Sequence, residues 1–259
     1  MELKTGDEIE LLRLNALIVS RTLSEVAKYI KPGISTRMLD KIAEDYLRSE
    51  GAIPGFKGYN GFPNALCISI NEEVVHGIPG DRVLKNSDIV SIDCGSIKHG
   101  YYGDSAYTFA VGEVKPEVLD LLRRTKESLT LGIEMAVAGK RIGDISSVIQ
   151  NYVEGFGYSV VRELVGHGIG KKLHEKPDVP NYGRKGTGVK LQEGMTLCIE
   201  PMINLGTKNI TQSKDGWTIC SSDGLPSAHY ELTVAVTKDE ADVLSTFEYI
   251  EEVLGPNKI

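Results

Sequence analysis

The sequence is short of cysteine, tryptophan and histidine, with four, one and five of them in 259 residues. The cysteines show no C-x-x-C spacing and give no sign of a disulfide framework. Cationic residues are also in deficit, because 29 Lys and Arg against 36 Asp and Glu leave a net charge of −7. Nucleic-acid affinity depends mainly on clustered Lys and Arg, so no specific nucleic-acid partner is expected.

Long apolar runs and export signals are missing as well. No uncharged apolar run approaches the length that spans a bilayer, and MELKTGDEIELLR lacks the basic-then-apolar pattern of a signal peptide. We therefore expect a cytoplasmic protein that is neither exported nor embedded in a membrane. A monomer is favoured, since no extended coiled-coil pattern is present. The cysteines expected to be reduced thiols are Cys67, Cys94, Cys198 and Cys220.

A helix–turn–helix pattern occurs twice in the chain. Capping residues, apolar periodicity and glycine stops predict helices over about 5–31 and 36–51. The same signals predict a second pair over about 116–137 and 144–157, with Asp144 as the cap of the last helix. No low-complexity segment or Pro/Ser-rich linker separates the two pairs.

A constant offset relates the two copies. Apolar positions of the second and fourth helices lie 106 residues apart, and the strand-like runs that end at Asp93 and Glu200 match at an offset of 107. Each half would supply two helices and then several strands, an α+β arrangement with helices layered on one side of a largely antiparallel sheet. We predict a single catalytic domain over 1–259, built of two similar halves at approximately 1–110 and 111–259.

Four acidic residues interrupt strand-like runs. Asp93 occurs in VSIDCG, Asp104 in YYGDSAYTFAV, Glu200 in LCIEPMI and Glu231 in AHYELTVAV. A single such side chain would usually face solvent, but four of them, two related by the repeat, favour a common site. A hairpin would place Asp93 and Asp104 on neighbouring strands. Four close carboxylates cannot all stay ionised without cations, and no Lys or Arg lies within these runs.

Three histidines stand in distinctive contexts. His76 lies in VVHGIPG and His167 in LVGHGIG, both glycine turns after β-branched runs, and His174 follows seven residues after His167. This spacing differs from the H-E-x-x-H of a helical zinc site. A lone histidine is more often a hydrogen-bonded structural imidazole, which is our interpretation of His99.

The predicted donor set is rich in oxygen. Four carboxylates and one imidazole favour Co²⁺, Mn²⁺, Fe²⁺ or Zn²⁺ in an open catalytic site over a closed thiolate site. Two such ions about 3.5–4 Å apart would generate a bridging hydroxide and polarise a carbonyl. The residues alone therefore predict a dinuclear metallohydrolase.

The order of these motifs resembles that of the type I methionine aminopeptidases. The resemblance covers nearly the whole chain and includes SINEEVVHGIPG, VSIDCG, GYYGDSAYTF, GHGIGKKLHEKPDVPNYG and GMTLCIEPMI. It implies the pita-bread fold, a pseudo-two-fold symmetric antiparallel sheet covered by helices on its outer face. It also implies removal of the initiator methionine from nascent polypeptides, by dinuclear-metal hydroxide attack on the first peptide bond. A bacterial-type, minimal form fits best.

The resemblance assigns a role to each metal-site residue. Asp93 would chelate one of two divalent metal ions. Asp104 and Glu231 would bridge both ions, and His167 and Glu200 would complete the other. Glu200 would also take the proton of the bridging water.

The resemblance also implies substrate contacts. His174 would help to polarise the scissile carbonyl, and His76 would contact the scissile amide nitrogen. Aromatic edges and a thiol suit a thioether, although plain core packing explains Cys67 and Met202 about equally well. The implied pocket for the methionine side chain comprises Tyr59, Phe62, Cys67, Met202 and Trp217.

Two positions depart from the bacterial pattern. Leu173 stands where an aromatic residue commonly precedes the second histidine, and His229 stands where a glutamine precedes the Tyr-Glu pair. We expect both to affect substrate preference and to leave the chemistry intact.

Two alternatives and one partner follow from the resemblance. An X-Pro aminopeptidase or prolidase of the same fold usually carries an extra amino-terminal domain, for which the 75 residues before His76 leave little room. A noncatalytic binding relative would have lost metal ligands.

Action on nascent chains also suggests a ribosome-facing basic patch, although a solvated charged loop is the simpler explanation. That patch comprises Lys171, Lys172, Lys176, Arg184, Lys185 and Lys190.

Overall fold

The structure is a computed structural model, and it describes residues 2–255. Its helices are α1 (Gly6–Ala27), α2 (Thr36–Ser49), the 3-10 helix η1 (Tyr59–Gly61), α3 (Pro116–Ile133), α4 (Ile142–Glu154) and α5 (Glu248–Leu254). The strands of the first half are β1 (Ile53–Pro54), β2 (Leu66–Ile70), β3 (Glu73–Val75), β4 (Ile89–Lys98) and β5 (Tyr101–Ala110). Those of the second half are β6 (Ser159–Val160), β7 (Gly166–Gly168), β8 (Glu175–Val179), β9 (Thr196–Ile199), β10 (Met202–Asn204), β11 (Ile210–Gln212), β12 (Ile219–Ser221), β13 (Ser227–His229), β14 (Leu232–Val236) and β15 (Ala241–Val243).

The helix starts follow local capping chemistry. At α1 the Thr5 hydroxyl accepts from the Glu8 amide at 3.3 Å, and the Glu8 carboxylate accepts from the Thr5 amide at 3.0 Å, as the capping box predicts. The prediction that Asp144 caps the fourth helix is wrong. α4 begins at Ile142, and Asp144 lies in its first turn, where its carboxylate accepts from the Arg141 amide at 2.8 Å. A carboxylate at this position satisfies one unpaired amide of the helix start.

The strands pair antiparallel and are divided among several sheets. β4 is the centre of one sheet, with β5 along one edge and both β1 and β2 along the other. A second sheet has the order β15-β14-β9-β7-β8. Two smaller sheets have the orders β13-β10-β6 and β11-β12-β3. Helices together with antiparallel strands confirm the predicted α+β class.

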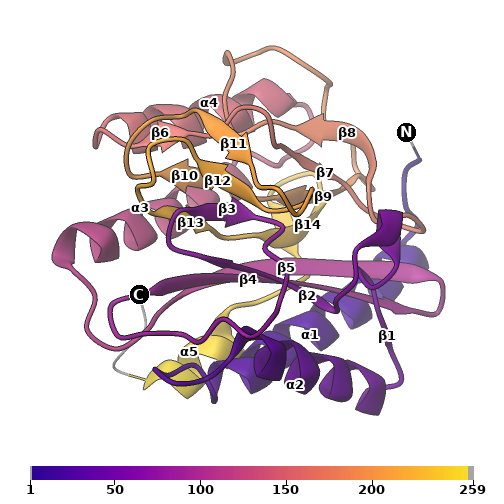
Figure 1. The fold of residues 1–259 in the computed structure, drawn as a ribbon. Helices are drawn as coiled ribbons and strands as arrows, with labels where there is room; N and C mark the ends of the chain where they lie inside the picture. The colour runs from indigo at the N-terminus through magenta and orange to yellow at the C-terminus, as the bar shows by residue number, and fades with distance from the viewer. Residues whose placement is uncertain (1, 256–259) are drawn as a thin grey trace.

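The strands lie between helices on opposite sides of the molecule (Figure 1). α1 packs on β4 and β5 and is flanked by α2 and α5, while α3 packs with α4 and contacts β9, β10 and β13. An isolated bridge between Ala106 of β5 and Glu231 joins strands from the two halves of the chain. The strand ends that carry the predicted site residues therefore meet between the helices.

The structure also bears on the cysteines and on membrane association. Cys67, Cys94 and Cys198 are buried and Cys220 is half-buried, all as free thiols, as predicted. Among residues 2–255, no helix is both long and apolar enough to cross a membrane.

Candidate active site

Carboxylates from both halves of the chain converge between the helices. The β4–β5 hairpin places Asp93 and Asp104 on adjacent strands, as their spacing predicts. Glu200 directly follows β9 and Glu231 directly precedes β14, and these two strands are paired. Asp104 and Glu231 are buried, and Asp93 and Glu200 keep a small exposed fraction. The structure thus brings together the four acidic residues singled out in the sequence.

His167 on β7 completes this acidic cluster. Its Nδ1 lies 3.0 Å from the Gly168 carbonyl, which can only accept, so Nδ1 carries the proton and Nε2 presents a lone pair. Nε2 lies 3.5 Å from Glu200 Oε1 and 3.8 Å from Asp104 Oδ2. Loss of solvent lowers the pKa of His167 to about 3. A neutral imidazole in this tautomer is suited to bind a metal ion.

The residues around the acidic cluster supply too little positive charge to keep all four carboxylates ionised. Burial raises the pKa of Asp93 to about 7 and that of Glu200 to about 8. Burial and the neighbouring carboxylates together hold the pKa values of Asp104 and Glu231 well above their usual range. Asp93 Oδ1, Asp104 Oδ1 and Glu231 Oε1 are buried without a hydrogen-bond partner among the described residues. Such unpaired acceptors are costly, so the donor set fits divalent cations.

Two residues beside the acidic cluster have no assigned role. Cys198 Sγ lies within 4.8 Å of ligand atoms of Asp104, His167 and Glu231. His229 is buried, and its Nε2 lies 3.4 Å from Glu200 Oε2. The signal for His229 in the sequence is its position two residues before Glu231, where we noted only a departure from the family pattern. Nothing in the sequence marks Cys198, which occupies an ordinary apolar strand position.

A cavity of about 170 Å³ lies over the acidic cluster. The predicted site residues that line it are Tyr59, Phe62, Cys67, His76, Asp93, Asp104, His167, His174, Glu200, Trp217 and Glu231. The sequence analysis did not assign Phe56 and Asn60, which also line the cavity, and noted Leu173 only as a departure. Met202 lies apart from this lining, buried in an apolar cluster with Val74, Val75 and Val161.

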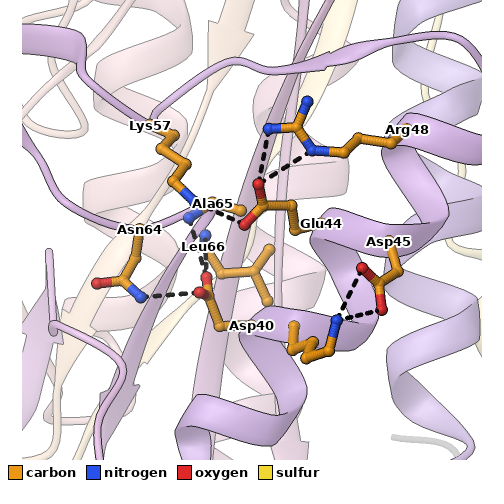
Figure 2. Close-up of polar contacts among 9 residues, drawn as sticks. Asp40, Glu44, Asp45, Arg48, Lys57, Asn64, Ala65 and Leu66 are labelled. Carbon is orange, nitrogen blue, oxygen red and sulfur yellow. Dashed lines mark hydrogen bonds and ion pairs between the residues drawn. The ribbon is translucent and has the colours of Figure 1, made fainter.

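The aromatic wall of the cavity, formed by Phe56, Tyr59, Phe62 and Trp217, includes a loop that side chains of α2 anchor. Figure 2 shows the polar contacts between α2 and this loop. The buried Asp40 carboxylate accepts from the amides of Ala65 and Leu66, both at 2.9 Å, where the loop that contains η1 leads into β2. At the other end of this loop, Lys57 donates to Glu44 at 2.7 Å. Anchoring at both ends presents the rings of η1 and its flank to the cavity. There, the Phe62 and Trp217 rings meet edge to face with centroids 5.2 Å apart.

His76 directly follows β3, at a point where the backbone passes very close to β2. Its φ of 59° lies in the left-handed region, which residues other than glycine seldom adopt. The next residue, Gly77, accepts a 2.8 Å hydrogen bond from the Ile68 amide of β2. A Cβ at Gly77 would lie 2.1 Å from the Ile68 carbonyl oxygen, so only glycine fits this approach. Burial and two nearby histidines lower the pKa of His76 to about 4.

His174 stands on the other side of the cavity, just before β8. Its Nδ1 lies 2.8 Å from the Tyr59 hydroxyl, and its ring packs edge to face on His167 with centroids 4.3 Å apart. Burial lowers the pKa of His174, so the ring is neutral near pH 7. With Tyr59 donating to Nδ1, the proton of His174 resides on Nε2.

The chain is similar to proteins of a known family. Residues 10–238 match the description Metallopeptidase family M24. The chain belongs to this family. A methionine aminopeptidase from Clostridium acetobutylicum is 52% identical over 247 residues, which cover 95% of this chain and 99% of that protein. The crystal structure of a methionine aminopeptidase from Thermotoga maritima matches with a TM-score of 0.94 and 43% identity, over 95% of this chain and 99% of that one.

A more distant relative shares the fold alone. An Xaa-Pro dipeptidase from Bacillus anthracis matches with a TM-score of 0.75 at 23% identity, over 94% of this chain and 62% of that longer one. Membership of family M24 makes the chain a metallopeptidase, a hydrolase that uses divalent metal. The predicted resemblance to type I methionine aminopeptidases and the pita-bread fold are both confirmed. The noncatalytic alternative loses its basis.

Proposed function

We propose that this M24 metallopeptidase removes the initiator methionine from nascent polypeptides by hydrolysis of the first peptide bond. The observation that carries the proposal is a single cavity in which four carboxylates and three histidines lie beside an aromatic wall. A metal site and a pocket for an apolar side chain therefore share one space. The name of the C. acetobutylicum relative, methionine aminopeptidase, supports this substrate.

The acidic cluster would hold two divalent ions, drawn from Co²⁺, Mn²⁺, Fe²⁺ and Zn²⁺. Asp93 would hold one ion, His167 and Glu200 would hold the other, and Asp104 and Glu231 would be shared between the two. The unpaired oxygens of Asp93, Asp104 and Glu231 support this assignment. When bound, such ions supply an activated water and polarise the substrate carbonyl.

The protein's own residues position the substrate and move protons. Glu200, which lies beside His167 and His229, would accept the proton of the attacking water and return it to the leaving amine. His174 would donate from Nε2 to the scissile carbonyl oxygen, since Tyr59 occupies its Nδ1. His76 would contact the scissile amide nitrogen from the opposite wall. The thioether of methionine would pack among Tyr59, Phe62, Cys67 and Trp217.

The test is amino-acid release from Met-Ala-Ser and from an Ala-Pro peptide. Chelated protein is reconstituted separately with Mn²⁺, Fe²⁺, Co²⁺ and Zn²⁺, with Asp104→Asn as the control. We expect metal-dependent release of methionine from Met-Ala-Ser only, lost in Asp104→Asn. Cleavage of the Ala-Pro peptide alone would move the protein to the X-Pro branch, and activity that survives rigorous chelation would refute the metal site.

We further propose that the enzyme works as a monomer in the cytoplasm, as one catalytic domain of two similar halves near 1–110 and 111–259. Matching helix pairs in α1–α2 and α3–α4 support the two halves. A basic patch could also contact the ribosome surface. Reversing its charges should weaken ribosome cosedimentation at low salt, and unchanged cosedimentation would exclude this contact. The patch comprises Lys171, Lys172, Lys176, Arg184, Lys185 and Lys190.

A further inference from the structure

The loop that carries His174 is tied to the first residues of the chain by two ion pairs. Lys4 Nζ lies 2.7 Å from Glu175 Oε2, and the side chains are only 2% and 15% exposed. Lys171 Nζ lies 3.3 Å from Glu8 Oε1, in the first turn of α1. The loop between these two contacts contains His174. The amino-terminal segment therefore pairs with residues on either side of His174 in the sequence.

The Lys4–Glu175 ion pair is built into its surroundings. The Lys4 amide donates to the Gly194 carbonyl at 2.7 Å, which fixes the backbone from which the side chain extends. The second oxygen of Glu175 accepts from the Lys172 amide at 3.2 Å. A Cβ at Gly170 would lie 2.4 Å from Glu175 Oε1 and 2.6 Å from Lys4 Nζ, so a side chain at position 170 would displace the ion pair.

We infer that Lys4 is a positioning residue for His174. Glu175 is covalently adjacent to His174, and a largely enclosed carboxylate that loses its cation moves toward water. Such a movement would shift the backbone at residue 174 relative to Tyr59 and His167, the ring's other contacts. The inference rests on the proposed contact of His174 with the scissile carbonyl. Misplacement by about 1 Å can cost on the order of 10²-fold in rate.

The first test replaces Lys4 by methionine, which keeps most of the side-chain volume and removes the charge. In the metal-reconstituted enzyme we expect kcat for Met-Ala-Ser to fall about 10- to 100-fold with KM within about twofold, the pattern of an interaction made in the transition state. Lys4→Arg should restore most of kcat. Arg13→Met is the matched control, because Arg13 lies on α1 and pairs with Asp242 at 2.6 Å, away from the loop.

The decisive test combines Lys4→Met with His174→Ala. If Lys4 acts through His174, adding Lys4→Met to His174→Ala lowers kcat no further. An equal fall of kcat in both backgrounds would overturn the inference. A second readout uses the metal-free protein: the imidazole ¹⁵N signals of His174 should shift in Lys4→Met and stay unchanged in Arg13→Met. Unshifted signals in a folded Lys4→Met protein would also overturn it.

Failure of the inference and failure of the proposed function are separable. If His174→Ala leaves kcat unchanged, the proposed role of His174 is wrong and the inference falls with it. If His174→Ala lowers kcat while folded Lys4→Met does not, the inference alone is wrong. Should Lys4→Met be unfolded at the assay temperature, Glu175→Gln takes its place, because it removes the charge and keeps the side-chain volume.

Discussion

At the scale of single residues, His229 is held so that its ring faces a candidate catalytic carboxylate. It is 1% exposed, its amide donates to Thr108 Oγ1 at 2.9 Å, and its carbonyl accepts from the same hydroxyl at 2.7 Å. Within the described structure, Nε2 has no hydrogen-bond partner, and it lies 3.4 Å from Glu200 Oε2. The ring is therefore available to orient the Glu200 carboxylate.

Removal of this ring should weaken metal binding. We predict that His229→Ala lowers the affinity for Mn²⁺ about 10- to 100-fold, as loss of groups that support metal ligands commonly does. His229→Gln should stay within several-fold of the original, because its amide can donate to the same oxygen. Calorimetric titration of chelated protein measures both. His99→Asn, in an exposed turn, is the control, and an unchanged affinity of His229→Ala would contradict the prediction.

The five proposed ligands could be selected from the sequence because each is a polar residue that interrupts an apolar or glycine-rich strand. His229 and Cys198 could not be selected in this way. β13 is three residues long, too short for an alternating pattern to show which side chain faces the site. Which face of a short strand is buried depends on how its sheet twists against its neighbours.

At the scale of elements, the close contact between the backbone at Gly77 and β2 determines where His76 lies. The backbone at Gly77 touches β2 so closely that a methyl group would overlap the Ile68 carbonyl. The distance between the backbone at Gly77 and β2 therefore fixes how far the His76 imidazole extends into the cavity.

We predict that Gly77→Ala lowers the free energy of unfolding by about 1–3 kcal/mol, as overpacking typically does, and reduces kcat together with it. Urea unfolding monitored by Trp217 fluorescence measures the first effect. Gly80→Ala is the matched control, since no heavy atom lies within 4 Å of the Cβ it would carry. Equal stability of the two variants would show that the backbone at Gly77 can move away from β2 at little cost.

Long helices were the elements best predicted from sequence. Each of α1, α2 and α3 shows the helical period over several turns, so its presence is predictable. Each also begins where a capping residue or a proline predicts. The start of α4 was misplaced because an acidic residue at the third helical position and one at the cap give the same sequence pattern. Strands of two or three residues such as β6 and β11 carry no detectable period.

At the scale of the whole molecule, the acidic cluster links stability to pH. Burial raises the pKa values of Asp93 and Glu200 above those of the unfolded chain, so the folded metal-free protein retains protons that the unfolded chain releases. This contribution to stability is fully present below about pH 4 and is lost as the pH rises through about 7 to 8. Metal ions replace those protons, so their stabilising effect grows with pH.

We therefore predict that saturating Mn²⁺ raises the Tm more at pH 8.5 than at pH 6. At about a hundredfold excess over Kd the rise at pH 8.5 should be about 5–10 °C. Differential scanning calorimetry of chelated and reconstituted protein at both pH values measures it. Asp104→Asn should lose most of the rise, and an equal rise at both pH values would contradict the proposed ligands.

The α+β class of the molecule followed from the sequence, but the identity of the strands that join its halves did not. The internal repeat indicates two helix pairs, each followed by strands, and says nothing about which strand edges meet. The bridge between Ala106 and Glu231 is a tertiary contact between segments that share no local pattern.

The placement of the acidic cluster across both halves also sets an order of assembly. Asp93 and Asp104 are synthesised early, whereas Glu231 directly precedes β14, late in the sequence. During translation the chain thus carries an incomplete set of the proposed ligands until β14 has emerged. Contacts between such distant segments form late in folding, because the intervening chain must first be closed into a loop. With these ligands, the metal site would form only after both halves of the chain have been synthesised, and a chain that stops before Glu231 would lack one of its carboxylates.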